Sequence, residues 1–109
     1  MSIKTSIELR LFVTDHSAAA TRALDNLKAV CEDPEVARDH DIHIELIDVN
    51  DSPQSAEEDK ILVTPTLLKK LPLPVRRIVG DLSNEDDIFV ILDIKSPRKS
   101  GRWAGSTST

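Results

Sequence analysis

Hydrophobic and polar residues alternate in two segments of the chain, with the two-residue period of a β-strand. Residues 7–13 carry an apolar residue at every second position: Ile7, Leu9, Leu11 and Val13. Phe12 lies between them and indicates that the opposite face of this strand is also partly covered. Residues 42–49 repeat the pattern, with Ile42, Ile44 and Leu46 on one face and His43 and Glu45 on the other. Both segments are predicted strands.

Between these strands, apolar residues recur every three or four positions, which is typical of an amphipathic α-helix. These residues are Ala20, Ala23, Leu24, Leu27, Val30 and Cys31. Either Asp15 or Ser17 can cap the start of this helix. Pro34 ends its regular part, and the following "EVARDH" can add a turn.

The second half of the chain predicts shorter elements. Asp51 or Ser52 can cap a short helix that has Pro53 at its first position. Strands are expected near 66–70 and 75–79, separated by "PLP" at 72–74, and Gly80 permits a sharp turn after them.

The segment 83–94 has two interpretations. Ser83, followed three residues later by Asp86, predicts a capped helix, and acidic residues suit the start of a helix. "IFVI" is rich in β-branched and aromatic residues, which favour a strand.

The predicted order is strand, helix, strand, short helix, strand, strand, helix. A βαβ unit places its two strands in parallel, and the later two strands can form a hairpin. This α/β order resembles the thioredoxin-like βαβαββα domain, in which a segment like "TPTL" (64–67) precedes the third strand. The resemblance implies a cis Thr64–Pro65 bond. The alternative is an ordinary proline at the first residue of a strand, where proline is tolerated.

Composition limits the partners of the chain. Its 109 residues suffice for one domain, and the net charge is −5. Residues 95–109 hold four basic residues and no acid, so we predict a domain at 1–94 followed by a basic, disordered tail whose only large apolar residue is Trp103. An acidic body with 3% aromatic residues argues against nucleic-acid binding. No apolar run approaches the ~20 residues of a membrane span. The N-terminus has no signal-peptide pattern, so the expected location is cytoplasmic.

The cysteine and histidine content argues against a dithiol redox activity and against a metal site. Thioredoxin-like enzymes carry a Cys-x-x-Cys at the start of the first helix. This chain has "DHSAAAT" there, and its single cysteine, Cys31, lies at the far end of the helix on the apolar face. Three histidines, His16, His40 and His43, have no cysteine beside them and do not predict a metal site. We therefore expect neither a metal nor a cofactor.

One long block of sequence resembles the KaiB family of circadian clock proteins. This block is "AEEDKILVTPTLLKKLPLPVRRIVGDLS", Ala56–Ser83. "RALDNLK" (22–28) and "IDV" (47–49) fit the same family in the same order, and the resemblance extends over about residues 7–94.

The resemblance implies a regulator without enzymatic activity. KaiB-like proteins bind the ring of KaiC, a hexameric ATPase, and modulate its phosphorylation or signalling in a clock, a timer or a stress response. The partners implied are a KaiC-type ring, a clock-linked histidine kinase in competition, and further copies of the chain in a dimer or tetramer. The resemblance also implies two folds: a tetramer-forming ground state and a thioredoxin-like monomer, which differ in the C-terminal half.

Individual residues carry the expected roles. The resemblance implicates the basic residues Arg22, Lys60, Arg76 and Arg77 in ring binding or assembly. Arginine suits such a role because its planar fork pairs with both oxygens of a carboxylate. Neighbours on a strand point to opposite faces, so one of Arg76 and Arg77 can instead be a solvated charge or part of an internal ion pair.

The expected fold-switch segment contains Gly80, Asp81, Ile91 and Asp93. Family members usually carry glycine at the position of Ile91, and residues 33–41 form a stretch three residues longer than usual. Ile91 restricts the segment, which changes the expected balance between the two folds. The alternative function is a redox-inactive thioredoxin-like adaptor or sensor domain for a signalling kinase, without a fold switch.

Overall fold

The computed structural model describes residues 3–15 and 17–94. The described elements run in the order β1 (Thr5–Val13), α1 (Ala18–Cys31), α2 (Pro34–Asp39), β2 (His40–Asp48), α3 (Pro53–Glu58), β3 (Thr66–Leu71), β4 (Arg76–Val79) and α4 (Glu85–Leu92). The strands form one mixed sheet in the order β2-β1-β3-β4. β1 and β2 are parallel, whereas β3 is antiparallel to both β1 and β4, which confirms the predicted βαβ unit and hairpin. The predicted basic tail at 95–109, with Trp103, lies outside the described residues.

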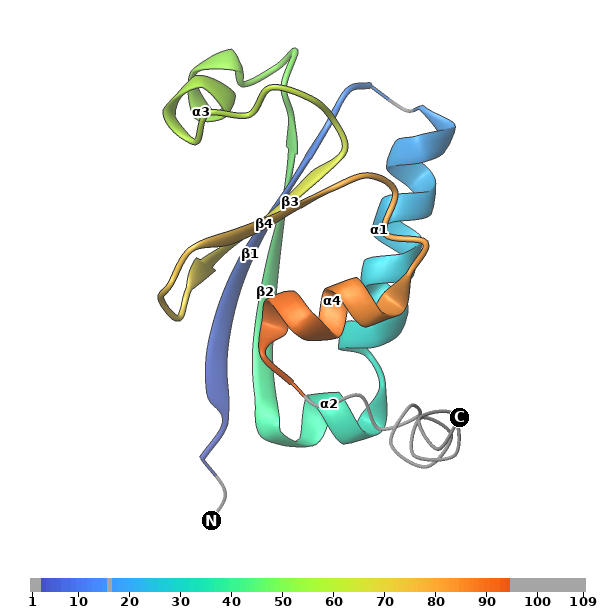
Figure 1. Cartoon of the computed structure of the whole chain (residues 1–109), viewed down its shortest axis with the longest axis vertical. Helices are drawn as coiled ribbons and strands as arrows, with labels where there is room; N and C mark the ends of the chain where they lie inside the picture. The colour runs from blue at the N-terminus through green and yellow to red at the C-terminus, as the bar shows by residue number, and fades with distance from the viewer. Residues whose placement is uncertain (1–2, 16, 95–109) are drawn as a thin grey trace, which may run out of the picture.

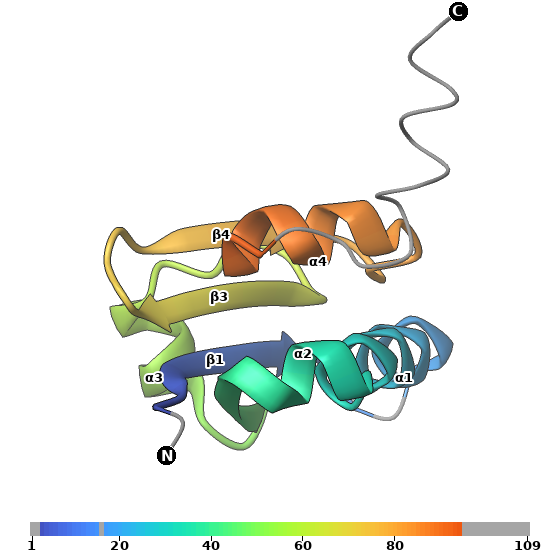
Figure 2. The same ribbon diagram turned by 90° about the horizontal axis from the view of Figure 1, so that it is seen from below.

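Helices cover both faces of the sheet unequally (Figures 1 and 2). α1 and α4 pack on one face, where the predicted apolar positions of β1 form the main core with Leu27, Val30 and Ile88. α3 covers part of the opposite face, where Phe12 is fully buried. The second, smaller core contains Phe12, Ile47, Ala56 and Leu68. The cover predicted over Phe12 is therefore confirmed.

The second strand differs from its prediction at one residue. Ile42 and Ile44 pack on the main core, but Leu46 is 51% exposed. Leu46 pairs with Leu11 in the register, so it lies on the expected face. Leu46 stays outside the main core, unlike Ile42 and Ile44 on the same edge strand. Ile47 is the buried residue at this end of β2, on the face that α3 covers.

Local capping settles the alternatives at the helix starts. Ser17, rather than Asp15, caps α1 by accepting a hydrogen bond from the Ala20 amide at 3.0 Å. "EVARDH" forms most of a separate helix, α2, which Asp33 caps through the Glu35 amide. Ser52 is at the N-cap position of α3, but its side chain makes no cap hydrogen bond.

The ambiguous segment is helical in this structure. α4 buries Ile88, Phe89, Ile91 and Leu92 on one side, and three acidic residues occupy its first turn. Asn84 is its N-cap and accepts from the Asp86 amide at 3.0 Å, so the prediction that Ser83 caps this helix is wrong. Asn and Ser are equally good caps, and the choice depends on which residue is extended where the chain enters the helix. The Thr64–Pro65, Leu71–Pro72 and Leu73–Pro74 bonds are all cis.

Candidate functional site

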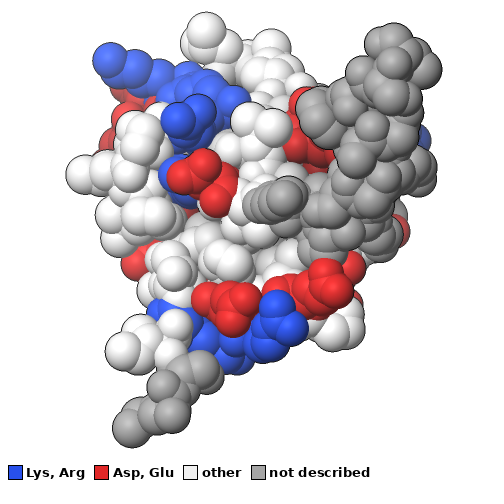
Figure 3. All heavy atoms as spheres, turned by 60° about the horizontal axis from the view of Figure 1, so that its bottom comes forward, with Lys and Arg blue, Asp and Glu red and all other residues white. Residues whose placement is uncertain are grey.

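The four basic residues expected to contact a partner come from three parts of the fold. Arg22 is on α1, Lys60 follows α3, and Arg76 and Arg77 are adjacent on β4. Figure 3 shows that basic side chains on one face lie in small groups with acidic side chains beside them. They do not form one continuous basic surface on that face.

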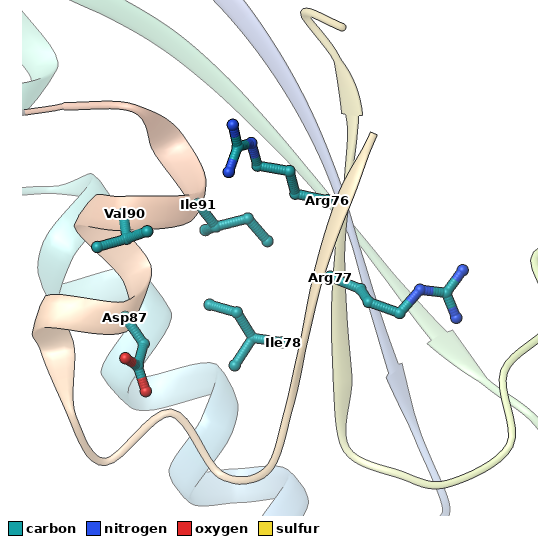
Figure 4. Close-up of a pocket in the computed structure, with 6 residues that line it drawn as sticks. All are labelled: Arg76, Arg77, Ile78, Asp87, Val90 and Ile91. Atoms are coloured by element: carbon teal, nitrogen blue, oxygen red, sulfur yellow. The ribbon is translucent and has the colours of Figure 1, made fainter. Parts of the chain in front are cut away.

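Arg76 borders a groove between β4 and α4 (Figure 4). The groove has a volume of about 460 Å³, and Arg76 and Asp87 lie toward its two ends, with apolar Ile78, Val90 and Ile91 between them. Val90 is 66% exposed, so the groove opens to solvent beside an apolar side chain. The Arg76 side chain is exposed and makes no hydrogen bond or ion pair within residues 3–15 and 17–94. Its charge therefore has no carboxylate partner within these residues.

Arg77 points to the other side of β4, as Figure 4 shows and as strand alternation requires. Its guanidinium donates to the backbone carbonyls of Lys60, at 3.0 Å, and Asp59, at 2.9 Å. These carbonyls lie just past the C-terminal end of α3, where unpaired carbonyl groups favour a cation. Arg77 thus makes internal hydrogen bonds to neutral carbonyl groups, which is neither the solvated charge nor the internal ion pair that the sequence left open, and its role in partner binding stays a prediction.

Asp59 receives two further cations. Its carboxylate accepts from Arg10 at 2.8 Å and from Lys70 at 2.9 Å, and its side chain is only 7% exposed. Burial raises the pKa of this carboxyl, but the hydrogen bonds and charges of Lys70 and Arg10 outweigh burial and bring the pKa below its ordinary value. Arg10 also contacts Glu45 at 3.3 Å. Cations from β1, β3 and β4 therefore converge on the end of α3.

Arg22 is engaged with the linker between β4 and α4. Its Nε donates to the Asp81 carboxylate at 3.0 Å, and Asn26, one turn along α1, donates to the Asp81 carbonyl at 3.0 Å. The side-chain hydrogen bond from Arg22, together with hydrogen bonds from Ser83, holds the pKa of Asp81 below its usual value. Two side chains of α1 are therefore hydrogen-bonded to the segment that leads into α4.

The residues expected to form a fold-switch segment lie in α4 or close to its two ends. Gly80 has φ +122°, a conformation that other residues rarely adopt, and its amide donates to the Pro65 carbonyl. Asp93 ends α4 in the left-handed conformation, with φ 59°. Ile91 is 2% exposed and packs in the main core. These residues define one helical conformation of the segment, and the second conformation remains a prediction.

Cys31 is a free cysteine that is partly buried against the main core. Burial, together with the Glu32 charge, raises the pKa of Cys31 to about 12, which keeps the thiol protonated. Within the described residues, no group of three His, Cys, Asp or Glu side chains could hold a metal ion. His16 lies outside the described residues. No helix within them is long and apolar enough to cross a membrane.

Comparisons with known proteins place this fold in a family. Residues 10–94 match the KaiB domain. The chain belongs to the KaiB family. It is 46% identical over 94 residues to the circadian clock oscillator protein KaiB of Synechococcus elongatus, which covers 86% of this chain and 89% of that protein.

Solved structures show the thioredoxin-like fold. The N-terminal domain of Synechococcus elongatus SasA superposes with a TM-score of 0.67 at 25% identity, covering 84% of this chain and 88% of that one. Oxidized mitochondrial thioredoxin 3 from Saccharomyces cerevisiae has a TM-score of 0.64 at 16% identity, covering 83% and 80% of the two chains. The predicted fold class is therefore confirmed.

Sequence reasoning missed three residues that hold the end of α3 in this KaiB-family protein. Arg10, Asp59 and Lys70 form a cluster that joins segments far apart in the chain, so only the strand register brings them together. Leu62 was also missed, although it is 93% exposed. The available signal is the apolar "ILV" at 61–63, between the charged "EEDK" and the "TPT" segment, in a stretch that no predicted helix or strand includes.

Proposed function

We propose that this protein is a non-enzymatic regulator that binds a KaiC-type hexameric ATPase and modulates its phosphorylation state or signalling. The setting is a circadian clock, a timer or a stress response. The observation that carries the proposal is its 46% identity to a circadian clock oscillator protein KaiB over 86% of the chain. The proposal includes self-association to a dimer or tetramer, and competition with a clock-linked histidine kinase for the ring.

Arg76 supports a direct role in ring binding. Its side chain is exposed and has no ion pair within the described residues, and it lies beside the exposed apolar Val90. An arginine next to an apolar surface is a frequent energetic centre of protein interfaces. A carboxylate on the ring that pairs with Arg76 would gain a hydrogen-bonded ion pair without breaking one inside this protein.

Arg22 and Lys60 differ in whether their side chains are already paired within the described residues. Arg22 already pairs with Asp81, so a contact with the ring competes with that internal pair. The Lys60 side chain makes no hydrogen bond or ion pair within the described part of the chain. We therefore rank Arg76 and Lys60 as direct ring contacts and Arg22 as a residue that also maintains the bound conformation.

The proposal excludes thioredoxin chemistry. A dithiol reaction needs two cysteines, and this chain has one. The raised pKa of Cys31 also removes the thiolate that nucleophilic chemistry requires. Its burial on the core side of α1 is that of a packing residue.

The test is association with a ring. The purified chain is mixed with a KaiC-type hexamer and ATP, and the mass of the complex is followed over hours by size exclusion with light scattering. Arg76→Glu should abolish the complex, whereas Arg38→Glu, an equal charge change at an exposed residue of α2, should leave it intact. Absence of a complex with the unaltered chain at micromolar concentrations would refute the proposal.

A second candidate is the redox-inactive adaptor or sensor domain for a signalling kinase. The similarity to the N-terminal domain of SasA favours it, because there the same fold forms one domain of a larger protein. An adaptor would bind its target rapidly and without a change in its own oligomeric state. Slow binding that accompanies dissociation of an oligomer would favour the first candidate.

A further inference from the structure

Val90 of α4 lies between two neighbouring hollows in the surface. One is the groove of about 460 Å³ between β4 and α4, and the other, of about 390 Å³, extends to Asp93 and Ile94 at the end of α4. Arg76 and Val90 line both hollows, so the two adjoin, and we call them together the α4 groove. Val90 is 66% exposed, although both of its neighbours in the sequence are buried. One exposed apolar side chain is common on protein surfaces, so the groove needs further evidence of an occupant.

The charged residues that line the α4 groove indicate what fits it. Arg76, Asp87 and Asp93 form no ion pair within residues 3–15 and 17–94. Figure 4 shows Arg76 and Asp87 toward opposite ends of the groove, with the apolar Val90 between them. A segment that combines positive charge with an aromatic ring suits this arrangement, because carboxylates attract cations and a guanidinium binds to the face of an aromatic ring.

The chain carries such a segment directly after α4. Ile94 lines the α4 groove and is followed by residues 95–109, which we call the C-terminal segment. This segment has four basic residues, no acidic residue and Trp103, the single tryptophan of the chain. The net charge of −5 combines +4 from the C-terminal segment with −9 from residues 1–94. The segment and the groove are therefore complementary in charge and in apolar character.

The C-terminal segment is long enough to place Trp103 against Val90. Trp103 comes nine residues after Ile94, and nine residues of extended chain span up to roughly 30 Å. α4 has eight residues and is about 12 Å long, so the whole helix is within reach. Because the segment is joined to the groove, its effective concentration there is of the order of millimolar. A contact too weak to form between separate molecules can therefore form within the chain.

We propose that the α4 groove binds the chain's own C-terminal segment. The Trp103 ring packs against Val90 and lies on the Arg76 guanidinium. Basic residues of the segment pair with the carboxylates of Asp87 and Asp93. The docked segment covers Arg76, so it competes with a KaiC-type ring for this face of the protein. The competition rests on the proposed function, whereas the docking does not.

Trp103 reports its own docking, because the chain has one tryptophan and no tyrosine. Quenching of its fluorescence by acrylamide is compared in the full chain and in a free peptide of residues 95–109. Quenching should be about threefold slower in the full chain, which corresponds to docking in about two thirds of the molecules. Equal quenching in the chain and the peptide would overturn the proposal and support the disordered tail expected from composition. Protection that rises with protein concentration would place the segment on a second copy and would also overturn it.

Matched variants test whether the α4 groove is the docking place. Val90→Lys replaces the exposed apolar side chain with a cation and keeps a good helix former, so quenching should return to the value of the peptide. Leu62→Lys makes the same kind of exchange at a 93% exposed residue beside α3, and it should keep the protection. Protection of Trp103 that survives Val90→Lys would exclude this groove.

The acidic residues of the groove are tested in the same way. Asp87→Asn/Asp93→Asn should lose part of the protection of Trp103, because it removes both carboxylates that the basic residues pair with. Asp25→Asn/Asp39→Asn is the control, since it makes an equal charge change at exposed residues of α1 and α2. Equal losses in the two double variants would show that only net charge matters and would contradict pairing in the groove.

Competition with the ring is measured with Trp103→Ala. A ring that binds only the undocked third of the molecules has its affinity lowered about threefold. Trp103→Ala should therefore bind a KaiC-type hexamer with ATP about threefold more tightly than the unaltered chain. Unchanged or weaker binding would overturn the competition. If the unaltered chain binds no ring, the proposed function fails, while quenching of Trp103 still decides whether the segment docks.

Discussion

Arg22 on α1 donates a 3.0 Å hydrogen bond to the carboxylate of Asp81, which lies 59 residues later in the linker before α4. The Asn26 side chain donates a hydrogen bond to the backbone carbonyl of the same residue, Asp81. The contact joins the first helix to the segment that the sequence predicted in two conformations. A residue implicated in partner binding by resemblance is thus also part of the internal structure.

Charge reversal separates these two roles of Arg22. Arg22→Glu should lower the thermal unfolding temperature slightly, since the pair is exposed and contributes little, and the double variant Arg22→Glu/Asp81→Arg should restore it. Lys28→Glu, at an exposed position on the same helix, is the control for net charge. Unfolding is followed by circular dichroism at low salt, where charge effects are largest.

Ring binding of the same variants distinguishes an internal role of Arg22 from a direct contact with the ring. If Arg22 acts only by holding the linker, the double variant should regain binding together with stability. If Arg22 also contacts the ring, the double variant should regain stability and remain defective in binding. A single variant as stable as the unaltered chain would show that the internal pair has no effect.

The Asp59 cluster predicts a specific dependence of stability on pH. The folded pKa of Asp59 is below its ordinary value, so the folded state favours the ionised carboxylate. Its contribution to the free energy of unfolding is present above the unfolded pKa, about 4, and is lost as pH falls through the folded pKa. Asp59→Asn should therefore destabilise the protein at pH 7, and the difference should shrink below about pH 4.

Urea unfolding at pH 7, 4 and 3 measures this difference. Asp39→Asn is the control, because Asp39 is exposed and, within the described residues, forms an ion pair only with Arg38, at 3.5 Å. Its effect should be near zero at every pH. A loss for Asp59→Asn that does not vary with pH would point to packing rather than to charge.

Local sequence patterns predict the order of the helices and strands, but they do not predict the contacts that surface side chains make. Alternation in β1 and the helical period of α1 each report burial against a single core, so both elements were predictable. α4 was ambiguous because its β-branched residues favour a strand while its buried face and acidic first turn suit a helix. Packing against the sheet decides between them. The role of Arg77 depends on carbonyls 17 and 18 residues away, a relationship that no local pattern contains.

Cys31 should be inert toward thiol reagents in the folded protein. With its pKa raised to about 12, the thiolate fraction at pH 8 is about a thousandfold lower than for an ordinary cysteine, because each pKa unit changes that fraction tenfold. The rate of iodoacetamide labelling, followed by mass spectrometry, should rise to the ordinary value in urea. Rapid labelling of the folded chain would show that α1 opens at its C-terminal end.

Ile91 provides the sharpest test of what holds α4 in place. It is 2% exposed in the main core, whereas the neighbouring Val90 is 66% exposed. Ile91→Gly removes a buried side chain and adds a flexible residue to a helix, which should cost about 3–6 kcal/mol. Because Val90 is exposed, Val90→Gly should lower the free energy of unfolding mainly through the poor helix propensity of glycine, by about 1 kcal/mol or less. Urea unfolding measures both, and equal losses would contradict the burial of Ile91.

The same pair of variants bears on the second fold. A loss of 3–6 kcal/mol is a large share of the roughly 5–15 kcal/mol that stabilises a typical domain, so it can populate an alternative packing of nearby free energy. If the C-terminal half has such an alternative, Ile91→Gly should yield a second set of amide signals in nuclear magnetic resonance spectra and a larger mass by light scattering. Val90→Gly should show neither change. An Ile91→Gly chain that only unfolds, with no second set of signals, would mean that α4 is the sole folded form of this segment, and that isoleucine at position 91 serves packing alone.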